Sequence, residues 1–395
     1  MKALVIAPQP FFSPRGTPFS VYYRTLVMAQ IGVEIDLLTY GQGQDVEIPG
    51  VRIIRIPRFE FLGPVKIGPS FLKLFLDLFL ISWTVFLLLR HRYKFVHAHE
   101  EAVFWCRFLK PIFGFKMVYD MHSSLPQQLT NFKFTKSRLL IGIFAWLEKS
   151  ALRHSDAVVT ICPDLHERAL KCGAAPEREF LIENSLFDPI RTESPNGSRV
   201  TKLVTEIPPA AGQRIVYAGT FEPYQGIDLL IRGFGQVRQK RPGVELVLVG
   251  GTPKQIAEMR LLAEKCQLNS SIVFIGQVSR SEAARWLASA NIVISPRVQG
   301  SNTPLKLYEL LASNVPIIAT NIWAHTQVLS EEVCFLVEPT PESLAAGIEA
   351  VVSNPERARA VAAAARNLYG SKYSQAAYKE RMDRLLHQLE SSCAV

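Results

Sequence analysis

GSNTPLKLYE at residues 300–309 and NVPIIAT at residues 314–320 are the stretches that decide the fold of this chain. Thr303 is a favoured residue at a helix N-cap and Pro304 at the first helical position, so a helix is predicted to begin there. The apolar run behind the next proline predicts a buried strand. A helix followed at once by a buried strand is typical of an α/β fold.

The start of this predicted helix also has the properties of an anion site. Backbone N–H groups without helical partners, together with the positive end of the helix dipole, hold an anion such as a phosphate. Lys306 adds a full positive charge in the first turn. Glu309 follows three residues later on roughly the same face, where its carboxylate can accept hydrogen bonds from two ribose hydroxyls. The stretch therefore predicts a site for a phosphate-bearing ligand with a ribose.

Strands and helices are expected to alternate along the whole chain. The expected strands lie near residues 2–7, 33–39, 51–56, 95–98, 116–121, 157–161, 214–218, 245–250, 272–275, 292–295, 315–320 and 333–336. The expected helices lie near residues 18–31, 70–91, 101–110, 136–154, 164–172, 227–240, 254–266, 280–289, 304–313, 325–330, 341–352, 355–369 and 374–392. This alternation predicts a doubly wound parallel sheet in each half of the chain.

The length of 395 residues suits two ordinary domains. Ser-Pro-Asn-Gly-Ser at residues 194–198 is a composition typical of a linker. We therefore predict a first Rossmann-like domain at residues 1–190, a linker at 191–210, a second Rossmann-like domain at 211–370 and a final helix at 371–395. Doubly wound sheets bind ligands at the carboxyl ends of their strands, so the two domains are predicted to face a central cleft.

These motifs resemble the retaining GT-B glycosyltransferases of family 4, also called glycosyl transferases group 1. The resemblance covers almost the whole chain and rests on residues 14–18, 217–231, 246–251, 274–278, 288–296 and 300–309. It implies a GT-B fold whose first domain contributes a glycine loop at residues 14–18. It also implies that the last helix crosses back to the first domain.

The resemblance implies that the second domain binds a nucleotide sugar. The residues that it assigns to the donor site are Gly16, Thr17, Gly219, Thr220, Val278, Ser301, Thr303, Leu305, Lys306 and Glu309. The family usually has a glutamate at the position of Ser301, and Arg and Lys where this chain has Thr220 and Gln225. Each missing cation removes a few kcal/mol, roughly, of stabilisation of the leaving diphosphate. Lys306 is the expected substitute.

A histidine at the end of a strand is the expected catalytic residue. His122 follows the strand at residues 116–121, and a histidine there can hydrogen-bond a hydroxyl or transfer a proton. The family places a histidine at this point, near the transferred sugar. His97, His99 and Glu100 close the preceding strand and are expected on the acceptor side. Because no Asp-x-Asp motif occurs, we expect no essential metal, and no cofactor besides the nucleotide sugar as substrate.

The formal net charge of +9 lies between Arg52 and Arg138, where 14 Lys and Arg stand against 5 Asp and Glu. The aromatic residues of the same region are Phe71, Phe75, Phe79, Trp83, Phe86, Phe104, Trp105, Phe108, Phe113, Phe115, Phe132 and Phe134. Basic and aromatic residues together predict a face that lies on an anionic membrane surface. A packed core with an ordinary basic surface is the alternative. Nucleic acid is not an expected partner, because no recognition motif accompanies the charge.

An apolar run at residues 74–89 must be tested as a membrane span. A spanning helix needs roughly 20 apolar residues, and this run has 16 residues and is interrupted by Asp77. We predict a buried or interfacial helix instead. The six cysteines form no CxxC pair, which is typical of reduced thiols in a cytosolic protein. The expected location is therefore cytoplasmic, peripheral on the inner face of the membrane.

Taken together, the sequence predicts a retaining hexosyltransferase of polysaccharide or glycolipid biosynthesis. It is expected to move a sugar from a UDP- or GDP-linked donor to a glycan or lipid-linked glycan. In the family's mechanism the donor phosphate helps to deprotonate the acceptor. A non-catalytic, membrane-associated assembly partner with the same fold is the rival interpretation, because the usual cations are missing. A sugar-nucleotide epimerase fits the cleft but not the basic, aromatic first domain.

Overall fold

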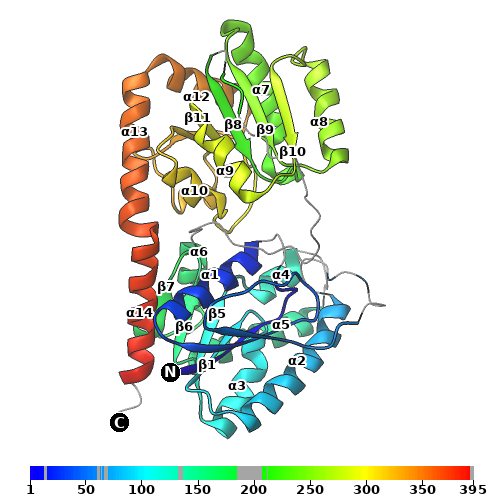
Figure 1. Cartoon of the computed structure of the whole chain (residues 1–395), viewed down its shortest axis with the longest axis vertical. Helices are drawn as coiled ribbons and strands as arrows, with labels where there is room; N and C mark the ends of the chain where they lie inside the picture. Colours follow the sequence, from blue (N-terminus) through cyan, green and yellow to red (C-terminus); the bar gives the residue numbers. More distant parts are fainter. Residues whose placement is uncertain are drawn as a thin grey trace. The chain divides into compact units, whose positions relative to one another are not determined.

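The computed structural model describes residues 1–12, 16–59, 63, 65, 70–131, 137–184, 207–210 and 212–391 (Figure 1). The chain divides into two compact units, Met1–Gly197 with Gln375–Val395, and Ser198–Ser374. Each unit is built on one parallel β-sheet, as the sequence predicts. Of the predicted linker at 191–210, only residues 207–210 are among those described.

The first unit holds a seven-stranded parallel sheet in the order β3-β2-β1-β4-β5-β6-β7. Its strands are β1 (Lys2–Ala7), β2 (Glu34–Thr39), β3 (Val51–Arg55), β4 (Phe95–His99), β5 (Lys116–Met121), β6 (Ala157–Thr160) and β7 (Glu179–Leu181). Its α-helices are α1 (Gly16–Gln30), α2 (Phe71–Arg90), α3 (Ala102–Phe113), α4 (Leu125–Asn131), α5 (Arg138–His154), α6 (Pro163–Lys171) and α14 (Gln375–Ser391). The strand order reverses between β1 and β4, the point at which such sheets bind ligands.

Helices cover both faces of this sheet, which explains the continuous apolar runs of its strands. Leu4 and Ile6 of β1 pack into a core with α2, α3, α5 and α6. Ala3 and Val5 point to the other face and pack into a core with α1 and α14. The C-terminal helix therefore contributes to the core of the first unit, where Met382 is fully buried.

Helix α2 packs one side of its apolar surface on the sheet and leaves several apolar side chains exposed. Within the described residues it is the one helix long and apolar enough to span a membrane, and 33% of its most apolar window is buried in the unit. On the buried side of the helix, Asp77 accepts a hydrogen bond from the Tyr40 hydroxyl at 2.6 Å. Burial, aided by the charge of Glu101, raises the pKa of Asp77 to about 8.

The second unit holds a six-stranded parallel sheet in the order β10-β9-β8-β11-β12-β13. Its strands are β8 (Arg214–Ala218), β9 (Glu245–Val249), β10 (Ile272–Gly276), β11 (Ile292–Ser295), β12 (Ile317–Thr320) and β13 (Phe335–Val337). Its α-helices are α7 (Ile227–Lys240), α8 (Pro253–Lys265), α9 (Arg280–Ala288), α10 (Lys306–Ala312), α11 (Trp323–Thr326), α12 (Pro341–Ser353) and α13 (Pro355–Leu368). The second unit has two hydrophobic cores. Helices α7 and α12 pack into one of them, and helices α9 and α10 pack into the other.

Every strand predicted from the sequence is present, and the additional elements include one short strand, β7, and one short α-helix, α4. β7 has three residues and pairs with β6 at the edge of the sheet, and so short a run shows no local pattern. Helix α4 has seven residues, which is too short for a clear helical period. The structure also places α11 at Trp323–Thr326, earlier than the predicted 325–330.

Candidate active site

In the second unit, glycines bring the carboxyl ends of three strands close together. The Gly219 N–H donates to the Val249 carbonyl at 2.9 Å, and the Gly250 N–H donates to the Gly276 carbonyl at 2.7 Å. Gly250 has a φ of 121°, and a Cβ at this position would lie 1.9 Å from the Gly219 oxygen. These glycines therefore allow a close approach of backbone at the edge where a parallel sheet binds its ligands.

Lys306 begins α10 at this same edge. Its Nζ donates to Oε1 of Gln225 at 3.1 Å and lies 4.4 Å from the centroid of the Tyr217 ring. Burial, together with the charge of Arg297, lowers the pKa of Lys306 to about 7. The ammonium group is thus only weakly stabilised by the protein, and an anion beside it would be favourable.

The predicted helix start at Thr303 is wrong. Helix α10 begins at Lys306, and Leu305 occupies the N-cap with helical dihedral angles and no capping side chain. The chain enters the helix through a tighter turn, in which the Leu307 N–H donates to the Pro304 carbonyl. The Thr303 hydroxyl is therefore not aligned with the first turn, and in the described part of the chain its buried Oγ1 has no hydrogen-bond partner.

Glu309 has a partner that the sequence did not indicate. Its Oε1 accepts a hydrogen bond from Nε of Arg280 at 2.9 Å, and about a quarter of each side chain is exposed, 28% and 29%. The ion pair fixes the position of the carboxylate beside α9. The sequence shows Arg280 as a charged residue at the first position of a predicted helix. It does not show that the partner of Arg280 is Glu309, 29 residues later.

The remaining predicted donor residues lie in separate loops. Thr220 follows β8, where its carbonyl accepts from the Tyr217 hydroxyl at 2.7 Å. Val278 follows β10, and the exposed Ser301 accepts at its carbonyl from Gln327 at 2.5 Å. Gly16 and Thr17 begin α1 in the first unit, and residues 14 and 15 of the predicted glycine loop lie outside the described residues.

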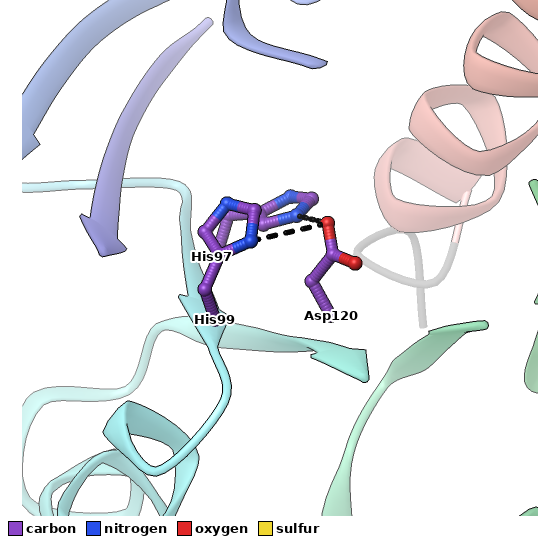
Figure 2. A group of neighbouring side chains, drawn as sticks. All are labelled: His97, His99 and Asp120. Carbon is purple, nitrogen blue, oxygen red and sulfur yellow. Dashed lines mark hydrogen bonds and ion pairs between the residues drawn. The ribbon is translucent and has the colours of Figure 1, made fainter. Parts of the chain in front are cut away.

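In the first unit, three histidines converge on one aspartate where β4 and β5 end. Figure 2 shows two of them, His97 and His99, beside Asp120. Nε2 of His97 lies 2.8 Å from Oδ2 of Asp120, and Nε2 of His122 lies 3.3 Å from Oδ1. Nδ1 of His99 lies 3.0 Å from Nε2 of His122. All four side chains are buried. The structure thus brings together the predicted catalytic histidine and two predicted acceptor-side residues.

Arg24 of α1 supplies the charge that balances Asp120. Its Nε lies 2.9 Å from Oδ2 of Asp120, and both side chains are fully buried. Burial opposes ionisation of Asp120, but the charge of Arg24 and the hydrogen bond with His97 outweigh it and hold the pKa of Asp120 well below its usual range. Burial lowers the pKa of His122 to about 4 and that of His99 well below its usual value. The two histidines are therefore neutral at pH 7.

The ligand atoms of His97, His99 and Asp120 lie within 4.8 Å of one another, as metal ligands do. The guanidinium of Arg24 already occupies the carboxylate, however, and a buried cation repels a metal ion. The residues fit a charge-balanced hydrogen-bond network better than a metal centre. Neither Arg24 nor Asp120 was predicted as a site residue, although a charged residue within an apolar run was a signal in each case.

Glu100 lies next to this network in a left-handed backbone conformation, with a φ of 50°. Its N–H donates to the Asp120 carbonyl at 3.1 Å, and its Oε2 accepts from the Ser123 hydroxyl at 2.8 Å. Burial and the neighbouring Glu101 raise the pKa of Glu100 to about 7. A carboxyl group that titrates near neutral pH can serve in proton transfer or bind a hydroxyl.

Both units of the chain match known glycosyltransferase families. Residues 25–185 match the family of glycosyl transferase 4-like domains, and residues 207–368 match glycosyl transferases group 1. One of the subunits of the phosphatidylinositol N-acetylglucosaminyltransferase of Arabidopsis thaliana is 22% identical over 90% of this chain and 76% of that protein. The phosphatidyl-myo-inositol mannosyltransferase of Mycobacterium tuberculosis is 30% identical, over 41% of this chain and 45% of that protein.

Among solved structures, HepE of Anabaena in complex with UDP has a TM-score of 0.73 at 16% identity, over 98% of this chain and 100% of that one. The two parallel sheets and this likeness define a GT-B fold. With the sequence matches in both units, the chain belongs to the glycosyl transferases group 1 family.

Proposed function

We propose that this protein is a retaining hexosyltransferase that transfers a sugar from a nucleoside-diphosphate sugar to the glycan part of a membrane lipid. The observation that carries the proposal is Lys306, whose ammonium lies at the carboxyl edge of the second sheet. Among the described residues its neighbours are an amide oxygen and an aromatic ring, and no carboxylate pairs with it. In a chain of a glycosyltransferase family, a sugar nucleotide is the anion that suits this site.

The proposed donor site uses three features of the second unit. Lys306 faces the diphosphate, and Gly219 and Gly250 allow the loops after β8 and β9 to pack closely together beside it. Glu309, oriented by Arg280, accepts hydrogen bonds from the ribose. The HepE complex supports UDP as the first donor to test, and GDP is the second.

The proposed chemistry needs no carboxylate nucleophile from the protein. The C1–O bond to the leaving diphosphate breaks while the acceptor oxygen bonds to C1 on the same face of the sugar. The departing phosphate oxygen accepts the proton of the acceptor hydroxyl. His122, neutral at pH 7, hydrogen-bonds a hydroxyl of the transferred sugar, and Arg24 and Asp120 keep the histidine network in place.

A membrane-bound acceptor is supported by an apolar surface on the first unit, which we call the outer helical face. Helices α2, α3 and α5 cover one side of the sheet (Figure 1). Their exposed apolar side chains are Phe71, Leu74, Phe75, Leu78, Phe86, Leu89, Phe108, Ile112, Leu139, Leu140, Ile143 and Trp146. Arg90 and Arg107 lie over Phe86 and Phe108, at 5.9 and 6.0 Å from the ring centroids. Aromatic and basic side chains side by side suit peripheral binding to an anionic bilayer.

The names of both relatives, which refer to phosphatidylinositol, support a lipid acceptor.

A non-catalytic, membrane-associated partner is the second candidate. It is favoured by one observation, the replacement of the usual donor-site residues by Thr220, Gln225 and Ser301. Such a protein would keep the outer helical face and lose turnover.

A transfer assay separates the two candidates. Purified protein is incubated with labelled UDP- and GDP-sugars and anionic vesicles that contain an extracted glycolipid fraction. We expect label in the lipid phase and release of the nucleoside diphosphate, with the anomeric configuration of the donor retained in the product. Lys306→Ala should lower the transfer rate at limiting donor by about 10-fold or more, and Arg359→Gln, on the exposed side of α13, should not change it. Nucleotide binding without release of diphosphate would favour the non-catalytic candidate.

A further inference from the structure

Arg297 lies two residues beyond β11, at the same edge of the second sheet as Lys306. Its guanidinium carbon lies 5.1 Å from the centroid of the Tyr224 ring, and its Nε donates to the Gln299 carbonyl at 2.7 Å. It is close enough to Lys306 for its charge to disfavour the ammonium form. Two cations from different loops therefore converge beside the loop that follows β8.

Neither cation is balanced by the protein. In the part of the chain that the structure describes, neither Arg297 nor Lys306 forms an ion pair with a carboxylate. Their neighbours are the rings of Tyr224 and Tyr217 and the amide oxygen of Gln225. Both side chains are partly buried, where like charges repel more strongly than in water. An anion bound between them would remove this repulsion.

The backbone that carries Arg297 is held by a buried network. The Thr320 hydroxyl donates to the Arg297 carbonyl. His325 links the ends of two strands, with its Nδ1 2.8 Å from the Thr320 carbonyl and its Nε2 3.1 Å from the Ser295 hydroxyl. Val298 N–H donates to the Tyr224 carbonyl at 2.9 Å, which joins this loop to the loop after β8. The position of Arg297 is therefore fixed before any ligand binds.

Glycines at two points allow this packing, one between the two loops and one within the loop of Arg297. Gly226 has a φ of 67°, and a Cβ there would lie 2.1 Å from the Pro296 carbonyl oxygen. Gly300 has a φ of 142°, and a Cβ there would lie 2.2 Å from a terminal nitrogen of Arg297. Side chains at either position would displace the loop or the guanidinium.

We propose that Arg297 and Lys306 together bind the diphosphate of the nucleotide donor, in place of the two cations missing at Thr220 and Gln225. The inference rests on the proposed function, and it adds Arg297 as a binding residue of that site. Lys306 already contacts Gln225, and Arg297 stacks on Tyr224 next to it. The two positive charges beside the loop after β8 thus come from the segment after β11 and from the start of α10. A guanidinium adds a planar pair of N–H donors that matches phosphate oxygens, and a lysine adds a point charge.

The test is calorimetric titration of wild type and Arg297→Gln with UDP and GDP, and with uridine and guanosine. For the diphosphate that binds wild type more tightly, Arg297→Gln should weaken binding by roughly 10- to 100-fold, the effect of losing a hydrogen bond to a charged group. The affinity for the matching nucleoside should stay the same, because it has no diphosphate. Arg359→Gln is the matched control and should bind like wild type.

Circular dichroism shows whether each variant is folded. If Arg297→Gln is not folded, Arg297→Lys replaces it, and loss of the planar donor pair alone should weaken diphosphate binding several-fold. A folded variant that binds the diphosphate as tightly as wild type overturns this inference and leaves the proposed function intact. Failure of the wild type to bind either diphosphate overturns the proposed function, and the inference with it.

Discussion

The candidate sites of the two units differ in how their charges are balanced. In the first unit, Asp120 has Arg24 at 2.9 Å and His97 at 2.8 Å, so the charges are balanced within the protein. In the second unit, Lys306 and Arg297 have only rings and amide or carbonyl oxygens beside them, within the described residues. A balanced network holds its geometry without a ligand, which suits positioning. Unbalanced cations gain stability from an anion, which suits binding.

The largest expected effect concerns the balanced network. Asp120→Asn should lower the free energy of unfolding by about 3–5 kcal/mol, because it leaves the buried charge of Arg24 without a partner. Urea unfolding measures the change. The control is Glu167→Gln, which removes an exposed pair with Lys171 and should cost less than about 1 kcal/mol. Equal losses in the two variants would mean that burial of the pair has no consequence.

The second prediction separates positioning from binding. His122→Ala should lower turnover by roughly 100-fold, the usual size of a contribution from hydrogen bonding or proton transfer at the reacting group. Nucleotide affinity should change little, because the proposed diphosphate site lies in the other unit. His387→Ala, at an exposed position on α14, is the control. Loss of turnover and nucleotide affinity together would point to a misfolded first unit.

The third prediction uses the titration of Lys306. Lys306→Ala should weaken diphosphate binding by about 10-fold or more. The pKa of Lys306 in the free protein is lowered to about 7, and the anion binds the protonated form. The affinity for the diphosphate should therefore be highest below pH 7 and should fall as the pH rises above 7. The fall should end above the pKa of Lys306 in the complex, which the bound anion raises.

Lys306→Arg provides the control for this pH dependence, because a guanidinium stays charged. The affinity of Lys306→Arg for the diphosphate should not change between pH 6 and about 9. Over this range the wild-type Lys306 loses its proton. Parallel curves for the wild type and Lys306→Arg would assign the titration to another group, and the charge of Lys306 would then not control donor binding.

The smallest expected effect concerns charges that face solvent. Arg90 is exposed on the outer helical face over Phe86, and Arg90→Gln should weaken binding to anionic vesicles by about 5-fold at low salt, equivalent to about 1 kcal/mol. High salt should abolish the difference, since exposed charges are screened. Vesicle sedimentation measures both, with neutral vesicles as the comparison. Binding that resists salt and alkaline wash would instead indicate insertion of α2.

The fold could be predicted because both faces of each sheet are covered, so each buried strand appears as an apolar run in the sequence. Lys306 and Glu309 were predicted as site residues from one local motif, and the structure places both on α10. Thr303 was wrong as a cap because the turn before α10 depends on contacts of the whole loop. Arg24 and Asp120 are 96 residues apart, and Arg297 meets Tyr224 from another strand. Contacts between residues so far apart in the sequence depend on the order of the strands in the sheet, and a local sequence pattern does not reveal that order.

The central claim is that the unbalanced cations of the second unit bind a nucleoside diphosphate. Calorimetric titration of the wild-type protein with UDP, GDP and the two nucleosides tests it most directly. The account predicts that one diphosphate binds at least about 10-fold more tightly than its nucleoside, since phosphate contacts to charged groups contribute about 1.5–3 kcal/mol each. Equal affinity for a diphosphate and its nucleoside, or no binding of either diphosphate, would contradict it.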